Sequence, residues 1–399
     1  MSTYPTYKLG DICELLNGFA FKSSNYVQSG LRVIRITNVK KGYVIDEEPQ
    51  FYPLETQEEL KKYILKKGDL LISLTGNVGR VGILREDLLP AALNQRVGCL
   101  RVKDKSLVSL QYLFHLLNTN SFEKDCINSS KGIAQKNMST EWLKEYEINL
   151  PPLATQRAIV TRIETLFAEL DKAVQHLRTA QQQLKTYLQA VLNHWLNNDD
   201  GKWEMVKLKD ICLSISDGDH LPPKRTTQGI PFITISDIKG NCIDYSDVSY
   251  MTEEYYESLS NNRKAQIGDI LYTVTGSFGI PVMVEDDKKF CFQRHIGLVR
   301  PNPKLAAQKW LYYMMQSPII YSQANEKATG TAQKTVTLTV LRDFNLPLPP
   351  LSDQHRIVQE IESRLSQATE TETYIENALQ QAEALRQSIL KKAFSGELV

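Results

Sequence analysis

The longest regular pattern in the chain is a stripe of apolar or small residues that recur at alternating steps of four and three positions. Steps of this kind are typical of a coiled-coil seam, which is narrower than the apolar face of an ordinary surface helix. We therefore predict one long helix from about Thr155 to Leu196 and a second one near the C-terminal end. At ~1.5 Å per residue the first helix is roughly 60 Å long.

Neither stripe can be buried by its own helix, so the two helices are expected to pack on each other in antiparallel orientation. Glu372 places a carboxylate on the second stripe, where a polar residue usually fixes the register at some cost in stability. The expected seam residues are Ile159, Ile163, Leu166, Leu170, Ala173, Leu177, Ala180, Leu184, Tyr187 and Val191, followed in the second helix by Ile361, Leu365, Ala368, Ile375, Leu379, Ala382 and Ile389.

A different pattern precedes each long helix. Short β-branched and apolar runs, such as LRVIRITNV from Leu31 and DLLISLTG from Asp69, alternate with turn residues and with amphipathic stretches such as SLQYLFHLLNT from Ser109. This mixture predicts an α/β domain. Pro151 and Pro152 cannot lie inside a helix, but proline is tolerated where a helix begins, so they mark the end of that domain.

The whole arrangement occurs twice. YKLGDIC from Tyr7 is matched by VKLKDIC from Val206, and NLPPLATQRAIV from Asn149 by PLPPLSDQHRIV from Pro347, at offsets of 198 to 200 positions. Such a period is far longer than a solenoid repeat, so each copy is a domain followed by its helix. The predicted fold class is α+β: two mixed α/β domains in a tandem, pseudo-two-fold repeat, separated by a long antiparallel two-helix coiled coil. The predicted boundaries are 1–152 for the first domain, 153–197 for its helix, 198–350 for the second domain and 351–399 for the last helix.

One segment breaks the repeat. LLNGFAFKSSNYVQSGLRVIRITNVKKGY from Leu15 bears little likeness to LSISDGDHLPPKRTTQGIPFITISDIKGN from Leu213, although the framework strands match. We call these two stretches the variable segments. This difference indicates two domains that present different chemistry on one scaffold. Because duplex DNA has two-fold pseudosymmetry in its backbone, a two-fold protein is suited to two half-sites at a set distance. We therefore predict an asymmetric target in two parts.

Composition narrows the class of protein without identifying it. The chain has 399 residues, of which 42% are hydrophobic and 23% charged, as in soluble globular proteins of two or three domains. No apolar run is long enough for a membrane span and the first residues do not read as a signal peptide, so we expect a cytoplasmic protein. Residues 1–150 hold 20 Lys and Arg against 17 Asp and Glu, so charge alone does not indicate nucleic acid. Six cysteines without a CxxC pair predict buried thiols and no metal site.

The doubled set of motifs carries a family resemblance along essentially the whole chain. The motifs that occur twice are the turns Gly68-Asp69 and Gly268-Asp269, the pairs Gln95-Arg96 and Gln293-Arg294, the G-x-A-Q-K segments from Gly132 and Gly330, and the proline phrases with Gln156 and Gln354. Each motif is weak alone, but together they resemble the DNA-specificity subunit of type I restriction-modification systems.

This resemblance implies target-recognition domains that bind double-stranded DNA and conserved helices that fix the spacer. It also implies two methyltransferase subunits that carry S-adenosylmethionine and methylate adenine, with or without restriction subunits that add ATP-driven translocation and cleavage. The chain itself is expected to bind no cofactor.

Candidate DNA-binding residues were chosen among Arg, Lys, Asn, Gln and small polar residues near strand ends, because such side chains contact base edges and phosphates. Repeated positions are better candidates for phosphate contacts and non-repeated positions for base contacts, although any one of them can equally be an ordinary surface residue. The set is Lys22, Arg35, Asn38, Asn77, Arg80, Gln95, Arg96, Gln135 and Lys136 in the first domain, and Lys224, Arg225, Thr234, Asp237, Ser277, Gln293, Arg294, Gln333 and Lys334 in the second. The turns at Gly76 and Gly276 fit plain turn chemistry better than a phosphate-binding role.

The motifs of catalytic chains are missing. An adenine methyltransferase needs Asn or Asp, two prolines and an aromatic residue in succession, but Asn149 is followed by Leu150 and the prolines by Leu153. Gly330 to Thr335 lacks the glycine that a P-loop has before its lysine, and neither HExxH nor GxSxG occurs. We expect a chain without catalytic activity. A structural adaptor with two protein-binding domains remains the alternative.

Overall fold

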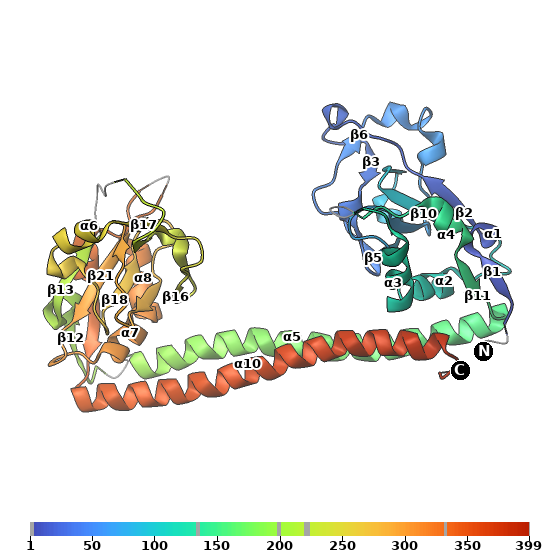
Figure 1. Cartoon of the computed structure of the whole chain (residues 1–399). Coiled ribbons are helices and arrows are strands. Elements are labelled where there is room, and N and C mark those ends of the chain that lie inside the picture. Colours follow the sequence, from blue (N-terminus) through green and yellow to red (C-terminus); the bar gives the residue numbers. More distant parts are fainter. Residues whose placement is uncertain (1–3, 133–135, 198–200, 219–223, 331–332, 399) are drawn as a thin grey trace. The chain divides into compact units, whose positions relative to one another are not determined.

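The computed structural model describes residues 4–132, 136–197, 201–218, 224–330 and 333–398, which fall into two units (Figure 1). The first unit comprises Met1–Leu177 and Asn377–Val399, and the second comprises Arg178–Glu376. Each unit therefore contains one repeat, part of the helix that follows it, and part of the other long helix.

The first unit is built on a four-stranded antiparallel sheet of order β2-β10-β7-β8 and a three-stranded sheet of order β6-β3-β9, in which β3 and β9 are parallel. These strands are β2 (Cys13–Asn17), β10 (Val97–Val102), β7 (Leu70–Ser73), β8 (Val81–Ile83), β6 (Phe51–Tyr52), β3 (Leu31–Ile34) and β9 (Ala91–Leu93). Every residue of β7 and β9 is buried, and all of them are apolar except Ser73 at the end of β7.

The second unit repeats both sheets, in the orders β13-β21-β18-β19 and β17-β14-β20. Its strands are β13 (Cys212–Asp217), β21 (Ile296–Pro301), β18 (Ile270–Thr273), β19 (Pro281–Met283), β17 (Ser249–Met251), β14 (Ile230–Ile233) and β20 (Cys291–Phe292). The predicted duplication is confirmed down to strand order.

Smaller elements complete each unit. Two-stranded sheets pair β1 (Thr6–Lys8) with β11 (Glu147–Asn149), β4 (Val39–Lys40) with β5 (Tyr43–Val44), β12 (Glu204–Lys207) with β22 (Asn345–Leu348), and β15 (Ile238–Lys239) with β16 (Cys242–Ile243). The short helices are α1 (Leu9–Ile12), α2 (Leu110–Leu117), α3 (Asn120–Ser129) and α4 (Thr140–Glu145) in the first unit, and α6 (Glu253–Ser258), α7 (Gln308–Gln316), α8 (Pro318–Lys327) and α9 (Leu338–Arg342) in the second.

A buried ion pair explains the repeated Gly-Asp motif. Asp69 is 2% exposed, and both of its oxygens accept hydrogen bonds from the Arg101 guanidinium, at 2.8 and 2.6 Å. The second unit has the same arrangement between Asp269 and Arg300, with the shortest contact at 2.7 Å. A two-pronged Arg–carboxylate pair fixes geometry as well as charge, so this motif braces the four-stranded sheet.

The long helices are α5 (Leu153–Leu196) and α10 (Leu351–Phe394), close to the range predicted for the first one. In the first unit the end of α10 lies against the beginning of α5 (Figure 1). Arg386 pairs with Asp171, and its guanidinium lies 4.3 Å above the Phe167 ring. Further toward the end of α10, Leu390 shares a core cluster with Ile163.

In the second unit the relation is reversed, because the end of α5 lies against the beginning of α10. Leu192 and Leu196 share a core cluster with Ile357 and Ile361, and the Arg356 guanidinium lies over the Trp195 ring. The helices are therefore antiparallel within each unit. The predicted fold class is confirmed: two mixed α/β repeats together with two long antiparallel helices.

Burial follows the predicted seam except at two positions of α5. Ala173 and Tyr187 are exposed, Tyr187 by 41%, while their neighbours Val174 and Leu188 are half-buried. An α-helix has 3.6 residues per turn, so a stripe of strict 3.5-residue spacing does not fit every turn of it. The other residues of the predicted seam are buried or half-buried, namely Ile159, Ile163, Leu166, Leu170, Leu177, Ala180, Leu184, Val191, Ile361, Leu365, Ala368, Ile375, Leu379, Ala382 and Ile389.

Candidate nucleic-acid interface

Three connections of the first repeat meet at one edge of the four-stranded sheet. The turn after β7 bonds to the turn before β10 through Leu74 N–H and the Arg96 carbonyl, at 3.0 Å. The same turn bonds to the segment before α4 through Gly76 N–H and the Lys136 carbonyl, at 2.8 Å. Backbone bonding thus gathers Asn77, Arg96 and Lys136, which are far apart in the sequence and all exposed. We call this set of turns the first interface edge.

The second repeat builds an equivalent edge with the same hydrogen bonds. Val274 N–H donates to the His295 carbonyl at 2.9 Å, and Gly276 N–H donates to the Lys334 carbonyl at 3.0 Å. Ser277, Gln333 and Lys334 are exposed there. We call this the second interface edge.

The β7–β8 turn is held rigid by a buried hydroxyl. Ser73 Oγ donates to the Asn77 carbonyl at 2.5 Å and accepts from Arg80 N–H at 3.0 Å. Thr273 makes the equivalent bonds to Ser277 and Ile280, at 2.8 and 2.9 Å. The amides of Gly76 and Gly276 are both used inside the fold, which supports plain turn chemistry.

The segment that differs between the repeats begins at the same edge. A Cβ atom on Gly18 would lie 2.1 Å from the Asn94 carbonyl oxygen, and one on Gly218 would lie 2.0 Å from the Phe292 carbonyl oxygen, so neither position accepts a side chain. Directly after Gly18, Phe19 N–H donates to Leu93 at 2.8 Å. The variable segment is therefore anchored beside the turn that presents Gln95.

A hollow of about 300 Å³ marks the first interface edge. Asn77 and Arg80 line it from the repeated framework, and Thr37 and Lys40 line it from the variable segment. Thr37 and Lys40 are not among the residues predicted from the sequence, although the basic pair Lys40-Lys41 close to Asn38 is a signal for them.

Strand register corrects one sequence match. Because Gly98 pairs with Asn17 and Gly297 pairs with Asp217, these two glycines are equivalent, and so Gln95-Arg96 occupies the place of Arg294-His295. The repeated letters Gln-Arg are one position out of register in three dimensions, so the pair is not a shared feature of both edges. Gln293 instead bonds to the His295 ring at 2.9 Å. Burial and the neighbouring Arg294 lower the pKa of His295, which favours its neutral form.

Four predicted residues brace loops through hydrogen bonds inside the fold. Asn38 is 3% exposed, and its amide accepts from Arg35 N–H at 2.9 Å and donates to the Ile45 carbonyl at 3.1 Å. Arg35 itself donates to the Glu48 carbonyl at 2.6 Å. In the second unit Asp237 caps the equivalent turn by accepting from Thr234 N–H and Oγ1, both at 2.7 Å. The side chains of Asn38 and Asp237 are thus already engaged in the fold.

The remaining candidates are spread over the variable segments. Lys22, Lys224 and Arg225 are exposed, and the Arg225 guanidinium lies 5.0 Å from the centre of the Phe232 ring. Gln135 lies outside the described residues.

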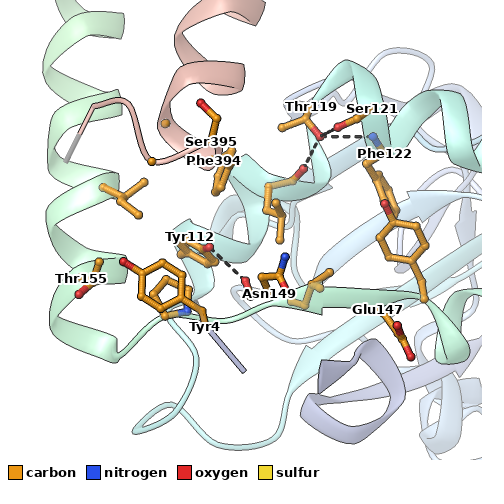
Figure 2. A pocket seen from close by; sticks show the side chains of 17 residues that line it. Tyr4, Tyr112, Thr119, Ser121, Phe122, Glu147, Asn149, Thr155, Phe394 and Ser395 are labelled. Carbon is orange, nitrogen blue, oxygen red and sulfur yellow. Dashed lines mark hydrogen bonds between the residues drawn. The ribbon is translucent and has the colours of Figure 1, made fainter. Parts of the chain in front are cut away.

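Figure 2 shows a second hollow, of about 560 Å³, where the first repeat meets the long helices. Tyr112 of α2, Asn149 of β11 and Thr155 of α5 line it together with Phe394 of α10, and Tyr112 Oη donates to the Asn149 carbonyl at 3.4 Å. Burial raises the pKa of Tyr112 to about 12. None of the predicted DNA-binding residues lines this hollow, so it is a feature of the joint with the long helices.

Within the described residues no group of three or more His, Cys, Asp or Glu side chains is arranged to hold a metal ion. In the same part of the chain no helix is both long enough and apolar enough to cross a membrane.

The chain thus contains two domains of one fold that present different polar edges. The chain belongs to the family of the type I restriction modification DNA specificity domain, whose model matches residues 1–177 and 200–381. Its function is therefore to recognise the DNA sequence for a type I restriction-modification system. This membership removes the adaptor alternative.

Individual relatives support the assignment over the full length. The type I restriction enzyme EcoBI specificity subunit of Escherichia coli is 28% identical over 98% of this chain and 85% of its own. The EcoKI specificity subunit of Escherichia coli strain K12 is 25% identical over 97% of this chain and 87% of its own.

Solved structures show the same fold. A chain from a study of complex assembly and conformational transition of the type I R-M system is 20% identical and matches all of both chains, with a TM-score of 0.72. The HsdS subunit from Thermoanaerobacter tengcongensis is 19% identical over 99% of this chain and 97% of its own, with a TM-score of 0.55.

Proposed function

We propose that each interface edge reads one half of an asymmetric, two-part sequence in double-stranded DNA, and that two methyltransferase subunits assemble on the chain and methylate adenine within it. The observation that carries this proposal is the pair of edges: their backbone bonds are the same, whereas their side chains differ. Equal halves would need equal side chains, so different edges favour two different half-sites.

The division of labour at each edge follows from the chemistry of the side chains. Lys136 and Lys334 sit at equivalent positions, so they are suited to the phosphates that every sequence shares. Arg96 and Asn77 correspond to His295 and Ser277 in the second repeat, so they are not shared. The planar guanidinium and amide groups of Arg and Asn can discriminate base edges in the major groove.

Cofactor, partner and location complete the proposal. The chain binds no cofactor of its own, and S-adenosylmethionine is bound by the methyltransferase subunits. Restriction subunits join the same complex where cleavage occurs, and the complex acts in the cytoplasm. The chain supplies recognition and the partners supply the chemistry, in keeping with its family and with the missing catalytic motifs.

Methylome sequencing tests the proposal. A host that expresses the chain with its methyltransferase partner is expected to gain methyladenine at one split, asymmetric motif, and a host that expresses the partner alone is not. An identical adenine pattern in both hosts, with both proteins present and associated, contradicts the proposal. A palindromic motif would contradict the assignment of different half-sites to the two edges.

A further inference from the structure

A fully buried glutamine lies in the first turn of α5. Gln156 is 0% exposed, and its Nε2 donates to the carbonyls of Leu107 at 2.9 Å and Pro151 at 2.8 Å. Its Oε1 accepts from Ser109 N–H at 2.8 Å. Two carbonyls and one N–H group surround the amide, so their chemistry fixes which end is nitrogen and which is oxygen.

The second repeat contains the same contacts at the start of α10. Gln354 is 0% exposed and donates to the carbonyls of Leu305 at 2.9 Å and Pro349 at 2.8 Å, while Ala307 N–H donates to its Oε1 at 2.7 Å. The shared phrase that contains these glutamines thus encodes one joint built twice.

Each amide connects two segments of its unit to the long helix. In the first unit these are the loop at the N-terminal end of α2, through Leu107 and Ser109, and the turn in which Pro151 leads into α5. α2 in turn contacts β8, a strand of the sheet that carries the first interface edge. The amide is therefore a buried polar link between the long helix and the domain that faces DNA.

Packing at this joint is incomplete in the first unit. The hollow of about 560 Å³ in Figure 2 lies against Pro151 and Thr155, so side chains do not fill the angle between the domain and the helices there. On its other side the joint is packed, because Ile159 and Ile163 share the apolar core of the first unit. Hydrogen bonds depend on direction, whereas apolar contacts tolerate sliding, so the buried amide limits the rotation that this apolar packing would permit.

We propose that Gln156 and Gln354 are positioning residues that fix the angle between each interface edge and its long helix, and that they thereby enforce the length of the DNA spacer. This inference rests on the proposed function. Adding one base pair to a spacer moves a half-site by ~3.4 Å and turns it by about 35°, so only a stiff joint rejects it. The two glutamines select spacer length and leave the choice of bases to the edges.

The test uses the complete complex of the chain with its methyltransferase partners. Methylation rates are measured on duplexes that carry the half-sites found by methylome sequencing, with the natural spacer or with one base pair more or less. The variants are Gln156→Met and Gln354→Met, singly and together, because methionine keeps the volume and removes all three hydrogen bonds. Gln156→Asn, which keeps a neutral amide on a side chain shorter by one methylene, serves if the methionine variants fold poorly.

Matched controls separate the joint from general stability. Arg157→Met and His355→Met change the adjacent, exposed helix positions. Leu70→Ala removes a fully buried side chain at the start of β7, away from the interface edge, so it lowers the melting temperature without removing any of the hydrogen bonds of Gln156.

We expect each glutamine variant to lower the preference for the natural spacer about fivefold or more, and the double variant to lower it further. The preference for the correct bases in each half-site should stay within about twofold, as should both preferences in all controls. Unchanged spacer preference in folded glutamine variants would overturn the inference, and so would an equal loss in the Leu70→Ala control. Failure of the unaltered complex to methylate any split site would instead contradict the proposed function.

Discussion

The two interface edges share a backbone and differ in charge. The side chains compared at the first edge are those of Lys40, Asn77, Arg80 and Arg96. At the second, the equivalent positions are Lys239, Ser277, Ile280 and His295, and Lys239 is neutralised by an ion pair with Asp244. The framework thus fixes the positions of these side chains, whereas the residue type at each position differs between the repeats. One scaffold can therefore hold an edge rich in cations and an edge that depends on shape and neutral donors.

Breaking the shared framework should have the largest effect, and the same effect in both units. Asp69→Ala leaves the half-buried Arg101 without its carboxylate, and Asp269→Ala does the same to Arg300. Each change should cost about 3 kcal/mol or more of the free energy of unfolding of its own unit. Amide hydrogen exchange in β7 and β18 locates the loss. Lys67→Ala, which breaks an exposed pair with Glu86, should change little. If only one of the two variants lowers the stability of its unit, the two frameworks are not equivalent.

Acid should lower the stability of the first unit through a group that the second unit lacks, because His115 in α2 occupies the place of Tyr313 in α7. Burial and the nearby Arg386 lower the pKa of His115 to about 4, whereas Glu164, at 3.9 Å, is too exposed to offset them. The unfolded chain therefore takes up a proton below pH ~6.5 that the folded chain resists until about pH 4. Stability from this group is complete above pH ~6.5 and is lost as the pH falls toward 4, by about 2 kcal/mol at pH 5.

The substitution His115→Tyr places the residue type of the second repeat, that of Tyr313, in the first repeat. Comparing this variant with the unaltered chain isolates the effect of His115 on stability. Denaturant unfolding of both chains at pH 7 and pH 5 measures the effect. The unaltered chain should lose more stability than the variant between these two values. Equal losses would mean that His115 titrates normally in the folded state.

Exchanging edge residues should have smaller effects, limited to one half-site. Arg96→His is expected to weaken recognition of one base pair in the first half-site by about 1 to 3 kcal/mol and to leave the second half-site unchanged. Lys136→Ala should weaken binding to all sequences alike and reduce the slope of log affinity against log salt by about one, as the loss of one phosphate contact requires. Binding titrations on duplexes with single base changes, at several salt concentrations, separate the two outcomes. An effect of Arg96→His on the second half-site would contradict the assignment of one edge to each half.

The long helices could be predicted from the sequence because their information is local. Apolar residues that recur at steps of three and four positions identify one face of a helix, and the prolines before Leu153 and Leu351 mark where each helix begins. The exposed Tyr187 shows the limit of that reasoning, since helix geometry departs gradually from a strict heptad.

The interface edges could be predicted only in part, because contacts between distant segments build them. The one-residue offset between Gln95-Arg96 and Gln293-Arg294 follows from strand pairing around Gly98 and Gly297, which the letters do not reveal. Asn38 is of a residue type that reads bases, yet the two carbonyls to which its amide donates lie seven and nine positions away and hold it inside the fold. Lys40 reaches the first edge because a two-residue strand places it there, and such short strands carry little periodic signal.

The crowded glycines have a consequence for protein engineering. Gly18 and Gly218 lie against backbone carbonyl oxygens at matching places, so they are fixed points between a constant scaffold and an exchangeable insert. A chimera that keeps each glycine and replaces the residues after it would keep the strand exit intact and change only the surface offered to DNA. The two glycines are therefore suitable fusion points for chimeras. Segments with different DNA sequence preferences can be combined there without redesigning the long helices.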